Sequence, residues 1–155
     1  MNRTLIIVIL ITMISLLLTN CSSTGGCHQN NYVVMTAGLH TLRNDTLIGF
    51  TLDSVWVAGV GNDSVLYNNT PSVTQLSLPL QENKNITQFV IRSNAVYDTL
   101  TCYHKNIPQY ISLECGCEMN YQLDSIITTH HLIKSVLIVQ KNVINQPTEN
   151  IQILY

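Results

Sequence analysis

The sequence is poor in charge. Asp, Glu, Lys and Arg make up only 10% of its 155 residues, and the formal net charge is −2. Basic residues are too few to form the positive patch that binding to a phosphate backbone requires, so we expect no nucleic-acid partner. Hydrophobic residues make up 46% of the chain. This much apolar material favours a folded core over a disordered chain.

The chain also lacks helical periodicity and catalytic signatures. No window repeats apolar residues at the i, i+3, i+4 and i+7 spacing for three turns. There is no Gly-x-Ser-x-Gly nucleophile elbow and no His-Glu-x-x-His zinc motif, and no pair of carboxylates is placed to converge in a cleft. We therefore expect a protein that is not an enzyme, with no catalytic residue, no cofactor and no metal.

Long hydrophobic runs are absent except at the start of the chain. Arg3 precedes an apolar run of 14 residues from Leu5 to Leu18, whereas a membrane-spanning helix needs roughly 20. A basic start and a short apolar stretch are typical of a secretory signal peptide. The segment Leu18-Thr19-Asn20-Cys21 is similar to a bacterial lipobox, which implies cleavage before Cys21 and lipid attachment to its sulfur. Two or more acyl chains make such an anchor durable.

The lipid anchor divides the chain into three parts. We predict a signal peptide at residues 1–20, a lipidated cysteine with a polar tether at 21–30, and a single domain at 31–155. Ser22 stands where the enterobacterial sorting rule has an aspartate in lipoproteins kept at the inner membrane. We therefore expect a lipid-anchored protein on the periplasmic side of the outer membrane, with the cell surface as the alternative.

The predicted domain is a series of short strands separated by turn residues. The expected strands are 32–37, 47–50, 54–58, 65–67, 73–78, 86–92, 99–104, 110–113, 119–123, 135–140 and 151–155. Asn106-Ile107-Pro108 is expected to form a turn, and 130–134 a brief turn or helix. About ten short strands with regularly spaced turns indicate an all-β antiparallel sandwich. We predict an immunoglobulin-like one.

All five aspartates begin the same tripeptide, Asp-(Ser/Thr)-aliphatic. Such an aspartate can bond the local backbone at a turn while the next two residues enter a strand. The tripeptide is also similar to the O-glycosylation acceptor of exported Bacteroidota proteins. The implied acceptors are Thr46, Ser54, Ser64, Thr99 and Ser125. The two interpretations are compatible wherever the hydroxyl faces solvent.

Four cysteines remain after the lipid anchor: Cys27, Cys102, Cys115 and Cys117. An even number in an exported chain favours disulfide bonds, and three pairings are open. A hairpin turning at 106–108 would place Cys102 diagonally opposite Cys115. The alternative is a thiol or metal-binding periplasmic protein that uses Cys102, His104, Cys115 and Cys117. The paired spacing of structural zinc sites is absent, which disfavours that alternative.

Several short segments follow one another along the chain in a recognisable order. They are Cys27, Asp53-Ser54-Val55, Leu78-Pro79-Leu80, Asp98-Thr99-Leu100, Glu114-Cys115-Gly116 and Ile151-Gln152-Ile153. In this order they resemble a family of small uncharacterised Bacteroidales lipoproteins, a domain of unknown function. The resemblance implies a Cys27–Cys115 disulfide and leaves Cys102–Cys117 as an additional one. We expect a noncatalytic lipoprotein that binds or organises an envelope protein or a glycan.

Replacing Cys21 with alanine is expected to abolish lipidation, because the thioether forms on that sulfur. Wild-type protein should incorporate labelled palmitate and sediment with membranes. The Cys21→Ala variant should carry no label and should be released from membranes or accumulate as an uncleaved precursor. Palmitate labelling that survives the substitution would contradict the predicted anchor.

Overall fold

A computed structural model describes residues 32–61, 64–113 and 115–155. All eleven elements in this part are strands. In chain order they are β1 (Met35–Arg43), β2 (Thr46–Gly49), β3 (Val55–Gly59), β4 (Val65–Thr70), β5 (Gln75–Leu78), β6 (Ile86–Ser93), β7 (Val96–Ser112), β8 (Gly116–Thr128), β9 (Ser135–Ile138), β10 (Asn142–Val143) and β11 (Ile151–Leu154).

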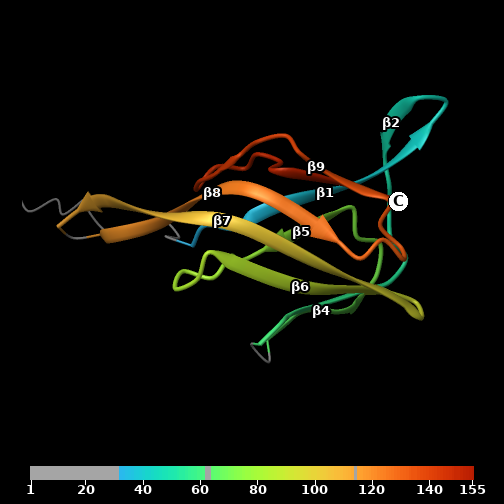
Figure 1. Ribbon diagram of the computed structural model, residues 1–155, viewed down its shortest axis with the longest axis horizontal. Helices are drawn as coiled ribbons and strands as arrows, with labels where there is room; N and C mark the ends of the chain where they lie inside the picture. The colour runs from blue at the N-terminus through green and yellow to red at the C-terminus, as the bar shows by residue number, and fades with distance from the viewer. Residues whose placement is uncertain (1–31, 62–63, 114) are drawn as a thin grey trace, which may run out of the picture.

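The strands form two sheets that face each other. One sheet has the order β2-β1-β11-β9, and β5 pairs with the first half of β1 on the edge that β2 occupies farther along. The other has six strands in the order β10-β8-β7-β6-β3-β4, and Figure 1 shows its β7 and β8 in front of β1. The expected all-β sandwich is confirmed, but it is not wholly antiparallel, because β1 and β11 pair in parallel. Its immunoglobulin-like order stays a prediction.

The core lies between the two sheets and follows the two-residue period of the strands. On β6, Thr87, Phe89 and Ile91 are buried, whereas the residues between them are more exposed. Met35 and Leu39 on β1 supply the opposite wall and are also fully buried. Removing each large apolar side chain of this kind from water contributes about 1.5–3 kcal/mol to folding. Alternating sequence patterns therefore fix which face of each strand turns inward.

The two longest strands form a hairpin that extends beyond the sandwich (Figure 1). β6 accompanies β7 only as far as the pair Ile86–Tyr103, so the later part of β7 has β8 as its one paired strand. The predicted turn at 106–108 is wrong, because these residues lie within β7. Pro108 is tolerated there because it lies on an edge strand, where a missing N–H disrupts little. The chain reverses later, between Ser112 and Gly116.

An extra residue in β8 explains why its length was underestimated. Tyr103 pairs with Ser125 and the next residue of β7, His104, pairs with Leu123, so Asp124 is left between two register positions. Such a bulge exchanges the inward and outward faces of a strand. Tyr121 and Leu123 therefore face the core before the bulge, whereas even-numbered residues do so after it. No single alternation runs through residues 116–128.

The loop at 129–133 is held in place by one buried carboxylate. Asp98 on β7 is fully buried and accepts hydrogen bonds from the N–H groups of His131, Leu132 and Ile133 at 2.6–2.7 Å. The hydroxyl of Thr129 donates a fourth at 2.6 Å. Burial by itself would raise the pKa of Asp98, but these donors outweigh it and hold the pKa well below its usual value. The predicted turn or helix at 130–134 is a bend.

The Asp98→Asn substitution should destabilise the protein by about 3 kcal/mol at pH 7, because it leaves buried N–H groups facing an amide in place of a charged acceptor. The pKa of Asp98 is lower in the folded protein than in the unfolded chain. Its contribution to the free energy of unfolding is therefore fully present above the ordinary carboxyl pKa, and it is lost as the pH falls through the pKa of the folded state. Urea unfolding measures the difference. Asp124→Asn, at an exposed carboxylate, is the control and should change stability by less than about 0.5 kcal/mol.

Candidate functional site

The outer face of the six-stranded sheet carries several exposed apolar side chains. Odd-numbered residues of β7 and even-numbered residues of β6 point outward, because their neighbours in sequence are buried in the core. Strand pairing sets these residues side by side in rows. This outer face consists of Trp56, Ala58, Ile86, Gln88, Val90, Arg92, Tyr97, Thr99, Thr101, Tyr103, Ser125 and Ile127.

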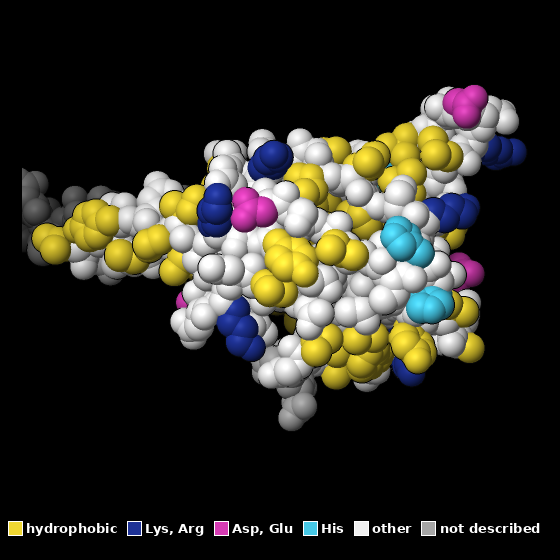
Figure 2. Space-filling view, in the orientation of Figure 1, with side chains coloured by type: hydrophobic (Ala, Val, Ile, Leu, Met, Phe, Trp, Pro, Cys, Tyr) yellow, Lys and Arg dark blue, Asp and Glu magenta, His cyan; other side chains and the backbone are white. Residues whose placement is uncertain are grey.

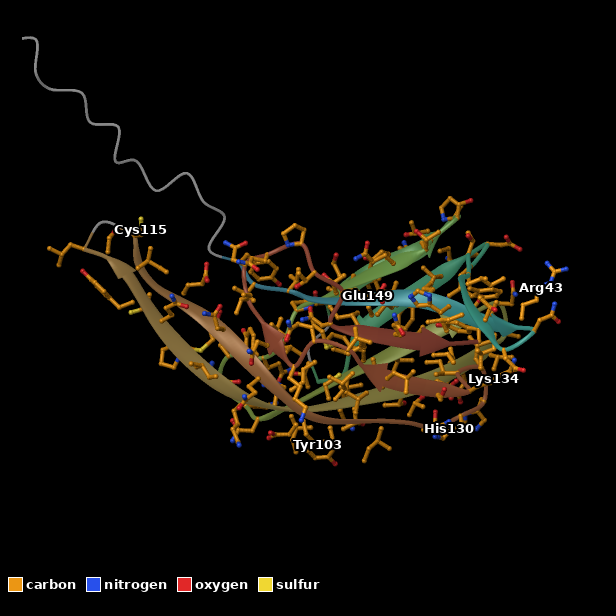
Figure 3. All side chains as sticks on the ribbon, turned by 90° about the horizontal axis from the view of Figure 1, so that it is seen from above. Arg43, Tyr103, Cys115, His130, Lys134 and Glu149 are labelled. Carbon is orange, nitrogen blue, oxygen red and sulfur yellow. The ribbon has the colours of Figure 1, made fainter. Side chains whose placement is uncertain are left out.

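Aromatic and aliphatic side chains on this face are open to solvent. Tyr97 is 61% exposed, Ile127 56% and Ile86 44%. Figure 2 looks onto this side of the molecule and shows hydrophobic side chains gathered over β6 and β7. Figure 3 shows Tyr103 on the edge of the molecule away from the other sheet. Exposed apolar patches on a protein surface commonly mark interaction sites.

One charge lies within the outer face, and it is stacked on an aromatic ring. The Arg92 guanidinium lies 5.1 Å from the centre of the Trp56 ring, and Arg92 faces Tyr97 across the strand pair. The outer face contains no acidic residue. At its border Lys105 pairs with Asp124 at 3.7 Å. Enrichment in aromatic residues and arginine, with few other charges, is the composition of a protein-interface centre.

Cys102 and His104 share the inner face of β7. Cys102 is fully buried opposite Ile126, and burial raises the pKa of its thiol to about 12. A thiol with so high a pKa is a poor nucleophile and a poor metal ligand at neutral pH. Its position among core residues gives it a packing role.

His104 is buried in a hydrogen-bonded network. The N–H of Gln81 donates to the Thr87 hydroxyl, which lies 2.8 Å from His104 Nε2. On the other side, His104 Nδ1 lies 2.8 Å from Asn106 Oδ1, and the Asn106 amide N–H groups donate to the carbonyls of Glu82 and Lys84. Hydrogen bonding therefore assigns a neutral ring with the proton on Nδ1. Burial lowers the pKa of His104.

The other two cysteines of the alternative metal cluster lie near the end of the hairpin. Cys117 is exposed opposite Tyr110, eight residues along β7 from Cys102, a separation of about 26 Å at strand spacing. The structure therefore does not bring the proposed ligands together. No group of three or more His, Cys, Asp or Glu residues placed to hold a metal occurs among the described residues.

The disulfide expectations are partly corrected. Cys102 and Cys117 are both free, so the expected bond between them is absent, and Cys102–Cys115 is excluded for the same reason. The Cys102–Cys115 expectation depended on a hairpin register that the longer β7 replaces, whereas Cys102–Cys117 was the pair that the family resemblance left over. Cys115 is disulfide-bonded. Cys27 lies outside the described residues, so the Cys27–Cys115 pairing stays a prediction.

The five glycosylation candidates differ in accessibility. Thr46, Ser64 and Ser125 are exposed, whereas Ser54 and Thr99 are half-buried. The aspartates also differ from the expected pattern of turn residues: Asp45 lies in a turn, but Asp98 and Asp124 lie within β7 and β8. Modification of the three exposed hydroxyls stays a prediction, which the intact mass of the purified protein tests.

Cys21 lies outside the described residues. Within the described part, no helix offers the length and apolar character needed to span a bilayer. This finding concerns the folded domain only.

In a comparison with protein families, residues 54–155 match the "Family of unknown function (DUF6452)". The chain belongs to this family. The matched region runs from just before β3 to β11 and includes the outer face and the projecting hairpin. No curated protein and no solved structure matches the chain. Membership of a family of unknown function is thus confirmed, while the Bacteroidales and lipoprotein attributes stay predictions.

The outer face was not recognisable from sequence, since the outward positions of β6 mix Ile86 and Val90 with Gln88 and Arg92. Its centre was not recognisable either, because Trp56 and Arg92 come together only through strand pairing. The role of Asp98 gave no local signal either, because its partners lie more than 30 residues away.

The two free thiols should differ in reactivity. In native protein a maleimide reagent should modify Cys117 and spare Cys102, which should react only after unfolding, because its thiol is buried and its pKa is raised. Peptide mapping of the unreduced protein reads out both results. The same map should contain a peptide that links Cys27 to Cys115, and four free thiols would contradict all disulfide expectations.

Stability should decrease as the pH falls below about 6.5, the ordinary histidine pKa, because the pKa of His104 is lowered on folding and the unfolded chain binds the proton more readily. Above that pH the contribution of neutral His104 to the free energy of unfolding is fully present. Urea unfolding at pH 8 and pH 5 should show a smaller loss of stability in His104→Gln than in wild type. Equal losses in the two proteins would exclude His104 as the source.

Proposed function

We propose that this protein is a noncatalytic, lipid-anchored envelope lipoprotein of the Bacteroidales that binds another envelope protein through the outer face of its six-stranded sheet. The observation that carries the proposal is the composition of that face. It combines Trp56, Tyr97 and Tyr103 with one stacked arginine and no acidic residue. A protein partner is favoured over a glycan because aliphatic side chains, among them Ile86 and Ile127, interrupt the aromatic ones.

The buried reactive groups support a noncatalytic role. Asp98 accepts hydrogen bonds from four donor groups, and both nitrogens of His104 have partners. Catalytic acids, bases and nucleophiles need access to a substrate. These side chains instead hold loops against the sheet, so their altered pKa values have a structural origin.

The proposed binding face can be tested in cells by photo-crosslinking. A crosslinking amino acid at position 101, within the outer face, should form protease-sensitive adducts with a discrete protein. The same amino acid at Ser77, on an exposed position of β5, is the control and should give at least tenfold fewer adducts.

Two glutamate substitutions provide the matched comparison. Ile127→Glu should reduce the adducts from position 101 at least tenfold, because it places a charge in the apolar interface. Leu137→Glu, at a residue of the other sheet with similar exposure, should leave them unchanged. Equal effects of both substitutions, or adducts that resist protease, would contradict the proposed protein partner.

A further inference from the structure

The end of the β7–β8 hairpin has an apolar surface that is open to solvent apart from Met119, which packs against the core. Pro108 lies opposite Met119 and Tyr110 lies opposite Cys117, so one face of the two-stranded ribbon consists of these four side chains. Tyr110 is 61% exposed. At the turn, Leu113 is 95% exposed. We call residues 107–113 and 115–119 the hairpin tip.

The opposite face of the hairpin tip is different. Asn120 donates a hydrogen bond to Gln109, and the Asn145 side chain donates one to Glu118, which ties this face to the loop after β10. This second face carries polar side chains together with Ile107 and Ile111 and is supported by the loop, whereas the first face and the turn expose the larger side chains of Tyr110 and Leu113. Exposing Leu113 and Tyr110 together is unfavourable in water and indicates a nonaqueous occupant.

The chain enters the sandwich at the end from which the hairpin projects. Tyr32 and Val34 line a hollow with Ile144 and Asn145, and the same two loop residues line a second hollow with Ile111. Figure 1 likewise shows the start of β1 and the hairpin at one end of the molecule. Figure 3 shows Cys115 near the far end of the hairpin. The segment that leads to the predicted lipid anchor therefore begins beside the base of the hairpin.

Chain length limits how far the membrane can lie from this end. Ten residues lie between Cys21 and Tyr32, and this segment spans at most about 40 Å from Cys21 to Tyr32. The hairpin beyond Tyr103 runs for nine residues to Ser112, or about 30 Å. With the predicted Cys27–Cys115 bond, five residues lie between the lipidated Cys21 and Cys27, a reach of about 20 Å from Cys21 to Cys27. Because the tether is this short and the hairpin about as long, the hairpin tip is able to contact the bilayer that holds the anchor.

We propose that the hairpin tip inserts its apolar face into the surface of the bilayer that carries the lipid anchor, as a second, noncovalent membrane contact. The proposal rests on the lipid anchor of the proposed function and adds how the domain is oriented on the membrane. Tyrosine at the boundary between headgroups and acyl chains, with leucine and proline beside it, is the chemistry that lipid interfaces accept. One lipidated residue alone permits free rotation of the domain. With the tip inserted, the long axis of the hairpin is fixed relative to the membrane.

Cys117 provides a native reporter for this contact, because it is free, exposed and next to Tyr110. Full-length lipidated protein, labelled at Cys117 with an environment-sensitive fluorophore, is incorporated into phosphatidylethanolamine–phosphatidylglycerol vesicles that contain spin-labelled lipid. The expected result is a blue-shifted emission and at least threefold quenching by the spin label. The same fluorophore on an Arg43→Cys, Cys117→Ser protein, at the far end of β1, should be quenched less than 1.2-fold.

Substitutions at the tip identify the contact. Leu113→Glu and Tyr110→Ser should each remove most of the quenching at Cys117, whereas Leu42→Glu, at a residue of similar exposure to Tyr110 near the β1–β2 turn, should not. All these side chains are exposed, so the sandwich should fold normally. Unquenched Cys117 in protein whose lipidation is verified by mass overturns the tip contact and leaves the anchor intact. Absence of lipid on Cys21 overturns the anchor itself. Protection of the fluorophore in native envelopes but not in vesicles would identify a protein as the occupant and overturn the proposal.

Discussion

The continuous pairing of β7 with β8 determines most of the molecule. β7 keeps one alternation of inward and outward residues over its buried half, so a single strand places Asp98, Cys102 and His104 in the core and Tyr97 and Tyr103 on the outer face. Its continuation beyond β6 produces the projecting hairpin. Core, outer face and hairpin tip are therefore fixed together, because a register shift of one residue would exchange inward and outward side chains in all three.

Buried polar groups then connect the loops to this strand. The Asp98 carboxylate replaces water for three consecutive backbone N–H groups of the loop after β8, while the network through His104 and Asn106 holds the turn before β6. An unpaired polar group in the core would cost several kcal/mol, and these groups are paired with loop backbone. Reactive residue types consequently serve to shape the fold. A strongly altered pKa in this protein reflects burial or, at Asp98, hydrogen bonds from loop backbone, and does not by itself indicate catalysis.

The outer face and the hairpin tip have different physical characters. The outer face is broad, aromatic and nearly uncharged, which suits a folded partner. The tip is narrow and exposes the apolar side chains of Leu113 and Tyr110 near its end, which suits a lipid surface. Their separation along the molecule means that membrane contact at one end would leave the outer face available. An anchored module that binds a second protein needs this arrangement, because a domain lying flat on the bilayer would hide part of its own binding surface.

Local pattern in the sequence was sufficient for the fold class and for most strands. The alternation at 73–78 predicts a strand because a strand exposes every second side chain, whatever its partners, and the run rich in aliphatic residues at 86–92 predicts another. The length of β7 was missed because proline at 108 is a turn signal locally, yet lies on an edge where it is tolerated. The part of β8 after residue 123 was missed because the bulge at Asp124 breaks the alternation of inward and outward residues. A bulge is a mismatch in pairing with the neighbouring strand, so the sequence of β8 alone does not reveal it.

By itself the sequence determined an all-β sandwich with a charge-poor surface, since composition and two-residue periodicity depend only on each segment. The lipid-attachment prediction is likewise a local pattern, at residues 18–21. Tertiary structure decided which cysteines stay free, which aspartate is buried, and which aromatic residues share a face. These properties depend on strand register and on contacts between residues more than 30 positions apart, such as Asp98 and Ile133. Such contacts form only when the two sheets pack, because nothing in either segment alone specifies its partner.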